Sequence, residues 1–551
     1  MATYYSGLPD ADPKERFQFW LDHPPSVIVL DVETVSLDEK HPLGFGLAVG
    51  PDEAFYFDLQ EPDEDKLRAI TPWLQDIRIR KLAHNWMFDM AVFPLIPVVG
   101  SALNRANIWD TNVAARLLGY QETALPMLVL DLFQEQISSA KDLLHKHSAK
   151  TMMGVPRAEV AEHCLSDVKM CYRLYLQWRE QIEKEYPEYF YIEMQVIPIL
   201  IDMSMRGVAI DQKARQELVD KYQLDIDFYR TVVQGYGIDN PGSSQQVGYM
   251  LGKRGNFLPL TRSKRQLATD EANLEFLDDP MAAAVLGYRH ATKFKSTYLD
   301  PLADTDRFYT EYFMDTVVGR LNSRNRNIQN IPLDARYMML PDSGVFTTAD
   351  YSQEHLYILA QASQDRDMLK VMYHPDKKKR DIHLYTAEKM SVPRQLAKTL
   401  NYAVIYGATA KVVSEQAKIK DTRRCQRLIE DWFHTFKGAA DWIHYAQEEG
   451  LRTGWALPTL FKRRIKLPPE NDDAMRRKAV NYPILGSDGE VIKRAILLCH
   501  KRGLGPPVMA ITVHDSLAWD GDVAERLPVE ELEHIPGYQI PLEVKTTLRW
   551  E

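Results

Sequence analysis

The sequence predicts an α/β domain over residues 1–188, followed by a larger α+β unit over residues 189–551. Residues 26–34 (SVIVLDVET) are rich in β-branched residues, which is typical of a buried strand. Further strand patterns then alternate with helical patterns through the first third of the chain, as in an α/β domain. Residues 186–310 are mostly helical in pattern, and the remainder mixes strand-like segments with a long helical stretch.

Bulk composition narrows the class of protein. A chain of 551 residues is longer than one hydrophobic core usually supports, so roughly two to four domains are expected. No apolar run reaches the about 18 residues that suggest a membrane span, and the N-terminus lacks the pattern of a secretory signal. The four cysteines are scattered, which fits a reducing compartment. We therefore expect a cytoplasmic protein without membrane contact.

The charge balance is acidic overall but basic in places. The net charge is −10 and the pI is about 5.9, which taken alone counts mildly against nucleic-acid binding. Basic residues nevertheless gather at residues 377–380, 462–464 and 476–478. Because a basic groove can lie within an acidic protein, the net charge does not exclude a nucleic-acid partner.

A first group of carboxylates lies in the predicted α/β domain. Asp31 and Glu33 are two residues apart on a predicted strand, so their side chains share one face of it. Asp89 and Asp167 are candidates to complete a cage of four carboxylates. Hard oxygen ligands of this kind suit Mg²⁺ or Mn²⁺. A lone acid is usually an ordinary surface residue, so only the set indicates a metal site.

A second pair of carboxylates lies in the larger unit. Asp350 ends a strand-like segment, and Asp515 lies between two strand-like runs, as at the tip of a hairpin. Two carboxylates from neighbouring strands could hold two metal ions, which is the arrangement that promotes in-line phosphoryl displacement.

The helix predicted over residues 394–407 separates these two carboxylates. Arg394, Lys398, Tyr402 and Tyr406 recur at four-residue intervals and so share one face of the helix. Cations suit a triphosphate, and aromatic rings suit a stacked base. An amphipathic helix with extended basic side chains is the alternative interpretation.

Taken in order, these segments resemble the family A DNA polymerases with a 3′–5′ proofreading exonuclease domain. The exonuclease resemblance rests on VIVLDVET (27–34), AHNWMFDM (83–90) and CLSDVKMCYRLY (164–175). The polymerase resemblance rests on VVGRLNSRNRNIQNIP (317–332), TADYSQ (348–353), RQLAKTLNYAVIYG (394–407) and VHDS (513–516).

The resemblance implies a fold and a domain order. The fold is a ribonuclease-H-like α/β exonuclease domain followed by an α+β right-hand polymerase. The implied domains are an exonuclease (1–188), a thumb (189–310), a palm (311–365 and 451–551) and fingers (366–450). The implied activity is primer-dependent, template-directed DNA synthesis by two-metal nucleotidyl transfer, with proofreading. We expect no 5′-nuclease domain, because too few residues precede residue 26 to form one, and this compact form suggests a phage, bacterial or organellar source.

The resemblance also implies residue roles. It implies that Arg394 and His383 contact the outer phosphates and that Lys398 contacts the α-phosphate. Further nucleotide contacts are implied for Tyr402, Tyr406, His355 and Gln353. Implied DNA contacts are Arg320, Asn327, Gln329, Arg477, Asn481 and His514. Implied metal ligands are Asp350, Tyr351 and Asp515 in one site and Asp31, Glu33, Asp89 and Asp167 in the other, with two Mg²⁺ or Mn²⁺ ions per site.

Implied partners are primer–template DNA, dNTPs and a single-stranded 3′ end at the exonuclease site. We expect a monomer, and the sequence leaves open whether replication accessory proteins bind it.

Several positions depart from the family pattern. His163 stands where a Tyr is usual four residues before the last exonuclease Asp, and a His there could orient or deprotonate the attacking water. His355 stands where a Glu usually blocks the 2′-hydroxyl of a ribonucleotide, and we expect it to exclude ribose in the same way. Tyr402 stands where many relatives have Phe, which predicts efficient use of dideoxynucleotides. Ala403, Leu485 and Ser516 depart as well, by drift or because the substrate carries an unusual base or sugar.

Three other readings compete with this one. A single-subunit RNA polymerase shares the catalytic aspartates and the helix with its Lys and Tyr, but it does not share the exonuclease segments. An exonuclease whose weakly active polymerase half only holds DNA is a second reading. A non-catalytic scaffold is the third, although a scaffold has no physical need for metal ligands.

Overall fold

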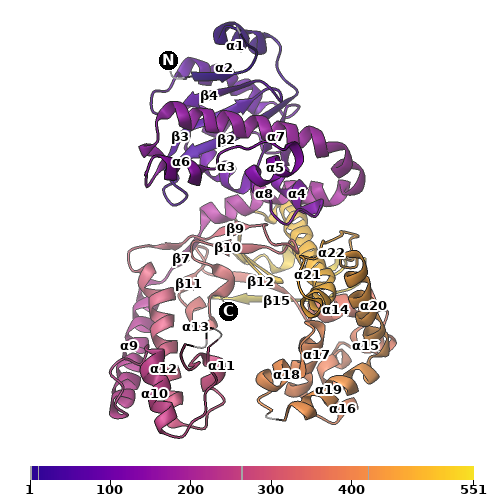
Figure 1. The fold of residues 1–551 in the computed structure, drawn as a ribbon. Coiled ribbons are helices and arrows are strands. Elements are labelled where there is room, and N and C mark those ends of the chain that lie inside the picture. Colours follow the sequence, from indigo (N-terminus) through magenta and orange to yellow (C-terminus); the bar gives the residue numbers. More distant parts are fainter. Residues whose placement is uncertain are drawn as a thin grey trace.

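A mixed sheet forms the centre of the N-terminal unit, which lies above the rest of the molecule in Figure 1. The computed structural model describes residues 3–9, 11–261, 263, 265–419, 421–535 and 537–550. The six strands run in the order β1-β4-β3-β2-β5-β6, with β2 antiparallel to β3 and parallel to β5. The strands are β1 (Thr3–Ser6), β2 (Val27–Thr34), β3 (Pro42–Ala48), β4 (Ala54–Asp58), β5 (Arg80–Ala83) and β6 (Ile108–Asp110).

Helices cover this sheet, and the longest of them lies across its centre. This helix, α7 (Arg157–Glu185), packs against β2, β3 and β4. It therefore brings Asp167 close to β2, the strand that carries Asp31. The helices are α1 (Pro13–Asp22), α2 (Glu64–Gln75), α3 (Trp86–Val92), α4 (Thr111–Leu117), α5 (Leu125–Phe133), α6 (Ala140–Lys146) and α7 (Arg157–Glu185). The α/β domain expected for the first third of the chain is thus confirmed.

Helix α8 (Pro187–Arg206) joins the N-terminal unit to the rest of the molecule. It ends at Gly207, whose φ of 61° lies in the left-handed region that favours glycine. The helix packs on α3 on one side and on α21 (Asp472–Cys499) on the other. One continuous hydrophobic core therefore extends from the N-terminal sheet to the helices below it.

Two helical arms stand on either side of a small sheet in Figure 1. The first arm begins after α8 and has a hydrophobic core of its own near its tip, which includes Val247, Leu251 and Val285. Its helices are α9 (Gln212–Gly235), α10 (Ser244–Lys253), α11 (Glu271–Leu274) and α12 (Pro280–Phe294). At its base lie β7 (Val208–Ile210), β8 (Arg307–Phe308), β9 (Glu311–Phe313), β10 (Asn322–Arg324), α13 (Leu333–Arg336) and β11 (Met339–Leu340).

The second arm is the long helical stretch expected between the two strand-like segments. Its helix α17 covers most of the range predicted over 394–407 and ends where Gly407 adopts a φ of 64°. The helices are α15 (Arg366–Met372), α16 (Ile382–Met390), α17 (Arg394–Ile405), α18 (Ala410–Gln416), α19 (Thr422–Thr435) and α20 (Lys437–Thr453).

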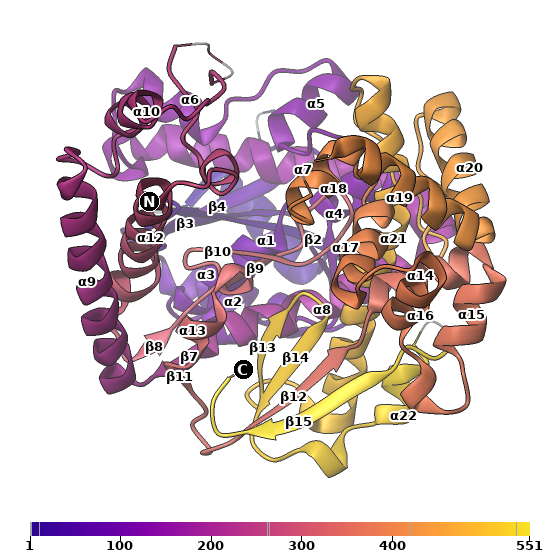
Figure 2. The same cartoon turned by 90° about the horizontal axis from the view of Figure 1, so that it is seen from below.

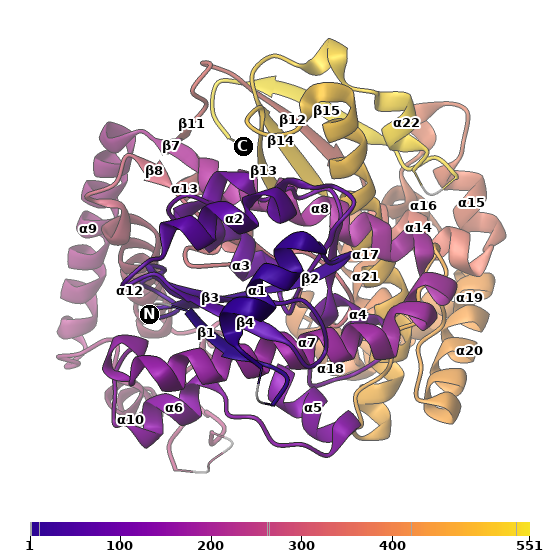
Figure 3. The same cartoon turned by 90° about the horizontal axis from the view of Figure 1, so that it is seen from above.

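An antiparallel sheet, which we call the floor sheet, lies between the arms and is seen from below in Figure 2. Its order is β13-β14-β12-β15. The strands and flanking helices are β12 (Phe346–Tyr351), β13 (Met509–Val513), β14 (Ser516–Asp520), β15 (Leu542–Thr547), α14 (Glu354–Ser363) and α22 (Val529–Glu533). In the view from above, the N-terminal unit lies over the middle of the molecule, with α9 and α20 visible on opposite sides of it (Figure 3). Within the described residues, no helix is long and apolar enough to cross a membrane.

Two candidate active sites

The first candidate site lies on β2 in the N-terminal unit. Asp31 and Glu33 share one face of this strand, as the alternation predicted, and their ligand atoms lie within 4.8 Å of one another and of the Cys164 sulfur. Asp89 on α3 is fixed beside the same strand because its Oδ1 accepts a hydrogen bond of 2.9 Å from the backbone N–H of Val32. Asp167 approaches from α7.

Burial raises the pKa of every carboxyl group in this set. Burial raises the pKa of Asp31 to about 6. Burial raises the pKa of Glu33, Asp89 and Asp167 well above the ordinary range, and the charge of Asp31 adds to each of these shifts. Carboxylates crowded in this way repel, and a divalent cation relieves the repulsion. Asp31 and Glu33 therefore fit ligands of one metal ion, whereas Asp89 and Asp167 lie outside the group whose ligand atoms are within 4.8 Å of one another.

Two neighbouring residues on α7 complete this site. His163 lies between two of the acids, with Nε2 3.7 Å from Glu33 Oε1 and Nδ1 3.7 Å from Asp167 Oδ1. Burial lowers the pKa of His163, so the ring is neutral near pH 7. Cys164 was not predicted to belong to this site, although its sulfur lies 3.3 Å from Asp31 Oδ2. The only feature of the sequence that pointed to it is that it directly follows His163.

The second candidate site lies on the floor sheet. Asp350 is directly opposite Ser516 on β14, and the Tyr351 N–H donates a 3.1 Å hydrogen bond to the Asp515 carbonyl. Asp515 occupies the turn between β13 and β14, as expected, and His514 before it has a φ of 53°. Strand pairing thus brings together two aspartates that are far apart in the sequence. The Tyr351 side chain points away into the core, where its hydroxyl donates to the Leu532 carbonyl.

The electrostatics of this site resemble those of the first. Desolvation by the surrounding protein, with the charges of Asp515 and Glu543, raises the pKa of Asp350 to about 6. Desolvation and the charge of Asp488 also raise the pKa of Asp515. A cavity of about 270 Å³ opens beside Asp350, and Glu543, Lys545 and Arg336 are among its lining residues. Asp350 lines this cavity and is crowded by the charges of Asp515 and Glu543, so its carboxylate fits a ligand of a divalent cation.

Helix α17 lies beside this site and carries the predicted face of Arg394, Lys398, Tyr402 and Tyr406. The Arg394 Nε lies 2.8 Å from Asp381 Oδ2, Lys398 is exposed, and Tyr402 is half-buried. His383 on α16 is buried, and its Nδ1 lies 2.9 Å from the side-chain nitrogen of Asn401. An amide nitrogen only donates, so the other ring nitrogen, Nε2, carries the proton of the neutral His383. Burial lowers the pKa of His383 to about 4.

The predicted DNA contacts are grouped around the end of α17 and the loop after β10. The Asn327 side chain accepts from the Gln329 N–H at 3.0 Å, and the Gln329 side chain donates to the Leu321 carbonyl. These two side chains therefore stabilise the loop itself. Asn481 on α21 approaches the Tyr406 carbonyl at 3.4 Å, and Arg477 packs against Gly407. His514 and Arg477 are exposed, and Arg320 is half-buried.

The sequence reasoning missed two buried acids behind this site. Asp488 on α21 and Glu354 on α14 are each 1% exposed. Asp488 Oδ2 lies 2.5 Å from Arg320 Nε and 3.5 Å from His355 Nε2. No periodic pattern distinguished these acids from surface residues, because their burial arises only when α14 and α21 pack together. Gln353, which precedes α14, adopts a φ of 56°.

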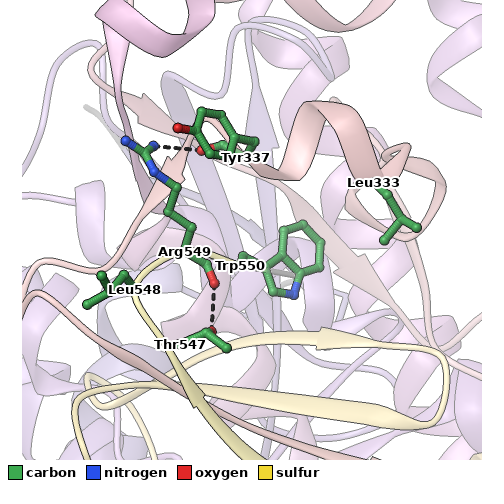
Figure 4. A pocket seen from close by; sticks show the side chains of 6 residues that line it. All are labelled: Leu333, Tyr337, Thr547, Leu548, Arg549 and Trp550. Atoms are coloured by element: carbon green, nitrogen blue, oxygen red, sulfur yellow. Dashed lines mark hydrogen bonds between the residues drawn. The ribbon is translucent and has the colours of Figure 1, made fainter.

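A further hollow of about 550 Å³ adjoins the carboxylate cavity, and the two share Thr547 and Trp550. Figure 4 shows Tyr337 and Arg549 side by side, with Trp550 and Leu333 along the opposite part of the hollow. The Arg549 guanidinium lies 4.2 Å from the Tyr337 ring centroid and donates to the Tyr337 carbonyl at 2.7 Å. An apolar surface with a cationic edge therefore continues from the cavity beside Asp350 toward α13 at the base of the first arm.

Comparison with known proteins agrees with this geometry. Residues 214–547 match the model of DNA polymerase family A, and residues 10–183 match that of a 3′–5′ exonuclease. DNA polymerase I of Chloroflexus aurantiacus is 28% identical over 543 residues, covering 89% of this chain and 56% of that protein. DNA polymerase I of Treponema pallidum is 27% identical over 514 residues, covering 85% of this chain and 50% of that protein. The chain thus spans about half the length of these relatives.

A solved structure shows the same fold. The POL domain of Pol1 from M. smegmatis, in complex with DNA primer-template and dNTP, superposes with a TM-score of 0.80 and 22% identity, covering 98% of each chain. At that identity the likeness concerns the fold, which is the right-hand arrangement with an exonuclease-type domain at the N-terminus. Because the family A model matches more than half of the chain, the protein belongs to DNA polymerase family A, and its N-terminal third is a domain of the 3′–5′ exonuclease type.

Proposed function

We propose that this protein is a primer-dependent, template-directed DNA polymerase that also removes mispaired 3′ ends. The observation that carries the proposal is the convergence of Asp350 and Asp515 on the floor sheet, next to the cationic and aromatic face of α17. A second, separate set of carboxylates on β2 supports the exonuclease.

The two arms and the floor sheet correspond to the parts of a right hand. We assign the first arm to the thumb, the floor sheet to the palm and the second arm to the fingers, with boundaries near residues 188, 310, 365 and 450. Primer–template DNA would lie between the arms, and the hollow at Tyr337 and Arg549 would contact its backbone. Contacts of this kind position DNA independently of sequence.

In the polymerase site, the chain's own residues bind and orient the nucleotide. Lys398 and Arg394 would bind the triphosphate, and Arg394 would exchange Asp381 for phosphate oxygens. The neutral His383 would donate its Nε2 proton to an outer phosphate. Divalent cations held by Asp350, Asp515 and the Tyr351 carbonyl would neutralise the phosphates and lower the pKa of the attacking 3′-hydroxyl. Mg²⁺ is the ion we expect at both sites, with Mn²⁺ as a substitute.

In the exonuclease site, Asp31, Glu33, Asp89 and Asp167 would hold cations against the scissile phosphate. The neutral His163, 3.7 Å from Glu33 and from Asp167, would accept a hydrogen bond from the attacking water and orient it.

Primer extension with two single-residue variants, one in each candidate site, tests the proposal. With Mg²⁺, a labelled primer–template and dNTPs, Asp350→Ala should abolish synthesis and leave degradation of a single-stranded 3′ end intact. Asp31→Ala should do the reverse, because the two sets of carboxylates lie in different parts of the fold.

The same assay separates the competing readings. Wild-type protein that degrades DNA but never extends a primer would leave only an exonuclease with a DNA-holding half. Synthesis from rNTPs without a primer would indicate an RNA polymerase. Loss of both activities in either single variant would contradict two independent sites.

A further inference from the structure

A chain of polar side chains runs from the interior to the end of helix α17. It begins at Asp488, which contacts His355 Nε2 at 3.5 Å and Arg320 Nε at 2.5 Å. It continues through His355, whose Nδ1 lies 2.6 Å from the Tyr406 hydroxyl, with the two rings edge to face. It ends at Tyr406, which is 37% exposed and lies one turn beyond Tyr402.

The carboxylate determines which ring nitrogen of His355 carries the proton. A carboxylate only accepts hydrogen bonds, so the nitrogen that faces Asp488 is the donor in the neutral ring. Nδ1 is then left with its lone pair and accepts from the Tyr406 hydroxyl. The tautomer of His355 and the orientation of Tyr406 thus follow from one buried acid.

Glu354 and Asp488 are the two buried acids in this region, and Asp488 is the one that carries the charge. Burial and the charges of Asp488 and Asp515 hold the pKa of Glu354 well above its ordinary range. Burial alone would raise the pKa of Asp488, but His355 and Arg320 lower it below its usual value. Neither Asp488 oxygen makes a well-directed hydrogen bond to a described residue, so the carboxylate keeps acceptor capacity. Contacts of this kind often tighten only when substrate binds.

We propose that Asp488 is a positioning residue that selects the sugar of the incoming nucleotide by holding His355 and, through it, Tyr406. The inference rests on the proposed polymerase function. His355 and Tyr406 together close the end of the face formed by Arg394, Lys398 and Tyr402, so a nucleotide bound there meets them directly. Because the buried Asp488 carboxylate holds His355 and Tyr406 in place, an added 2′-hydroxyl displaces them less easily than it would displace a free side chain.

Single-nucleotide insertion kinetics test this chain of contacts. The ratio of kcat/KM for a dNTP to that for the matching rNTP is measured for wild type, Asp488→Ala, Tyr406→Phe and the double variant. Each single change should lower the ratio by about 10-fold, which corresponds to the loss of one hydrogen bond near a charge. The double variant should lower it no further, because the chain is already broken.

Glu490→Gln is the matched control. Glu490 is a buried acid on the same helix, and it accepts from the Thr459 hydroxyl at 2.9 Å, away from His355. This variant should change thermal stability but not the ratio. A ratio within about twofold of wild type in Asp488→Ala, or effects that multiply in the double variant, would overturn the proposal.

Nitrogen NMR of ¹⁵N-histidine-labelled protein gives a second readout that needs no Asp488 variant. The His355 signals, identified by their loss in His355→Gln, should show the proton on Nε2 in wild type. A proton on Nδ1 would overturn the proposal even if Asp488→Ala does not fold. Wild-type protein that cannot extend a primer at all would instead contradict the proposed function, so the two failures are distinguishable.

Discussion

At the scale of single residues, both candidate sites contain carboxyl groups that lie close together and repel one another when ionised. Glu33 and Asp89 are buried beside Asp31, and Asp350 lies opposite Glu543 and near Asp515. Carboxyl groups whose pKa is raised in the folded chain cost stability once the pH exceeds their unfolded values. A bound cation removes this cost, so metal binding and stability are linked.

Mg²⁺ should therefore raise the melting temperature, and chelation should lower it. Glu33→Gln should melt on the order of 2 °C higher than wild type in the metal-free protein, because one repelling charge is gone. The same variant should show a smaller increase on adding Mg²⁺. Differential scanning calorimetry at pH 7.5 measures both, and an unchanged melting temperature in Glu33→Gln would contradict the repulsion argument.

Tyr402 carries a second prediction at this scale. It shares the face of α17 that carries Arg394 and Lys398, to which we assign nucleotide binding. Its hydroxyl would then replace the contact that a missing 3′-hydroxyl would have made. Wild type should then insert dideoxynucleotides nearly as well as dNTPs, and Tyr402→Phe should discriminate against them by at least about 10-fold. Competition between ddNTP and dNTP in primer extension measures this, with Tyr385→Phe on α16 as a control.

At the scale of elements, the tip of the first arm depends on one capping residue. Asp279 accepts from the Met281 N–H at the start of α12 and from the side chains of Arg254 and Asn256 after α10. It therefore joins two helices of a core that is separate from the main one. Although burial opposes it, these donors hold the pKa of Asp279 below its usual value.

Asp279→Ala should destabilise this tip by about 1–2 kcal/mol. Because the folded pKa is depressed, the stabilisation is present above about pH 4 and is lost as the pH falls through the lowered value. Amide exchange in α10 and α12 should therefore accelerate in the variant at pH 7, with α7 unaffected. Equal acceleration in α7 would show that the tip does not open on its own.

At the scale of the whole molecule, one buried ion pair joins the N-terminal unit to the polymerase body. Lys493 on α21 donates to Glu193 on α8, and Arg463 and Glu490 lie in the same buried cluster. Because α8 also packs on α3, the pair links the exonuclease-type domain to α21, the helix that carries both Asp488 and Asn481.

Lys493→Met should lower stability by about 3–5 kcal/mol, since it leaves Glu193 buried without its partner. Lys493→Met combined with Glu193→Leu should recover most of that loss, because neither charge remains buried. Urea denaturation midpoints at pH 7 compare the variants. A double variant as unstable as the single one would mean that packing, rather than charge, is limiting.

The sequence alone determined the elements and their chemistry. The strand period placed Asp31 and Glu33 on one face of a strand, and the helix period placed Arg394, Lys398, Tyr402 and Tyr406 on one face of a helix. The position of Asp515 between two strand-like runs placed it at a hairpin tip. These inferences needed only interactions between residues close in the chain, for which spacing is sufficient.

Only the tertiary structure decided which distant groups meet. Asp350 lies beside Asp515 because β12 pairs with β14, and Cys164 reaches Asp31 because α7 crosses the sheet. Asp488 and Glu354 acquire their role through the packing of α14 on α21, which buries two acids that the sequence presents as ordinary polar residues. Burial and long-range contact, unlike periodicity, depend on the whole fold, and they set the pKa values and hydrogen-bond partners on which the proposed chemistry depends.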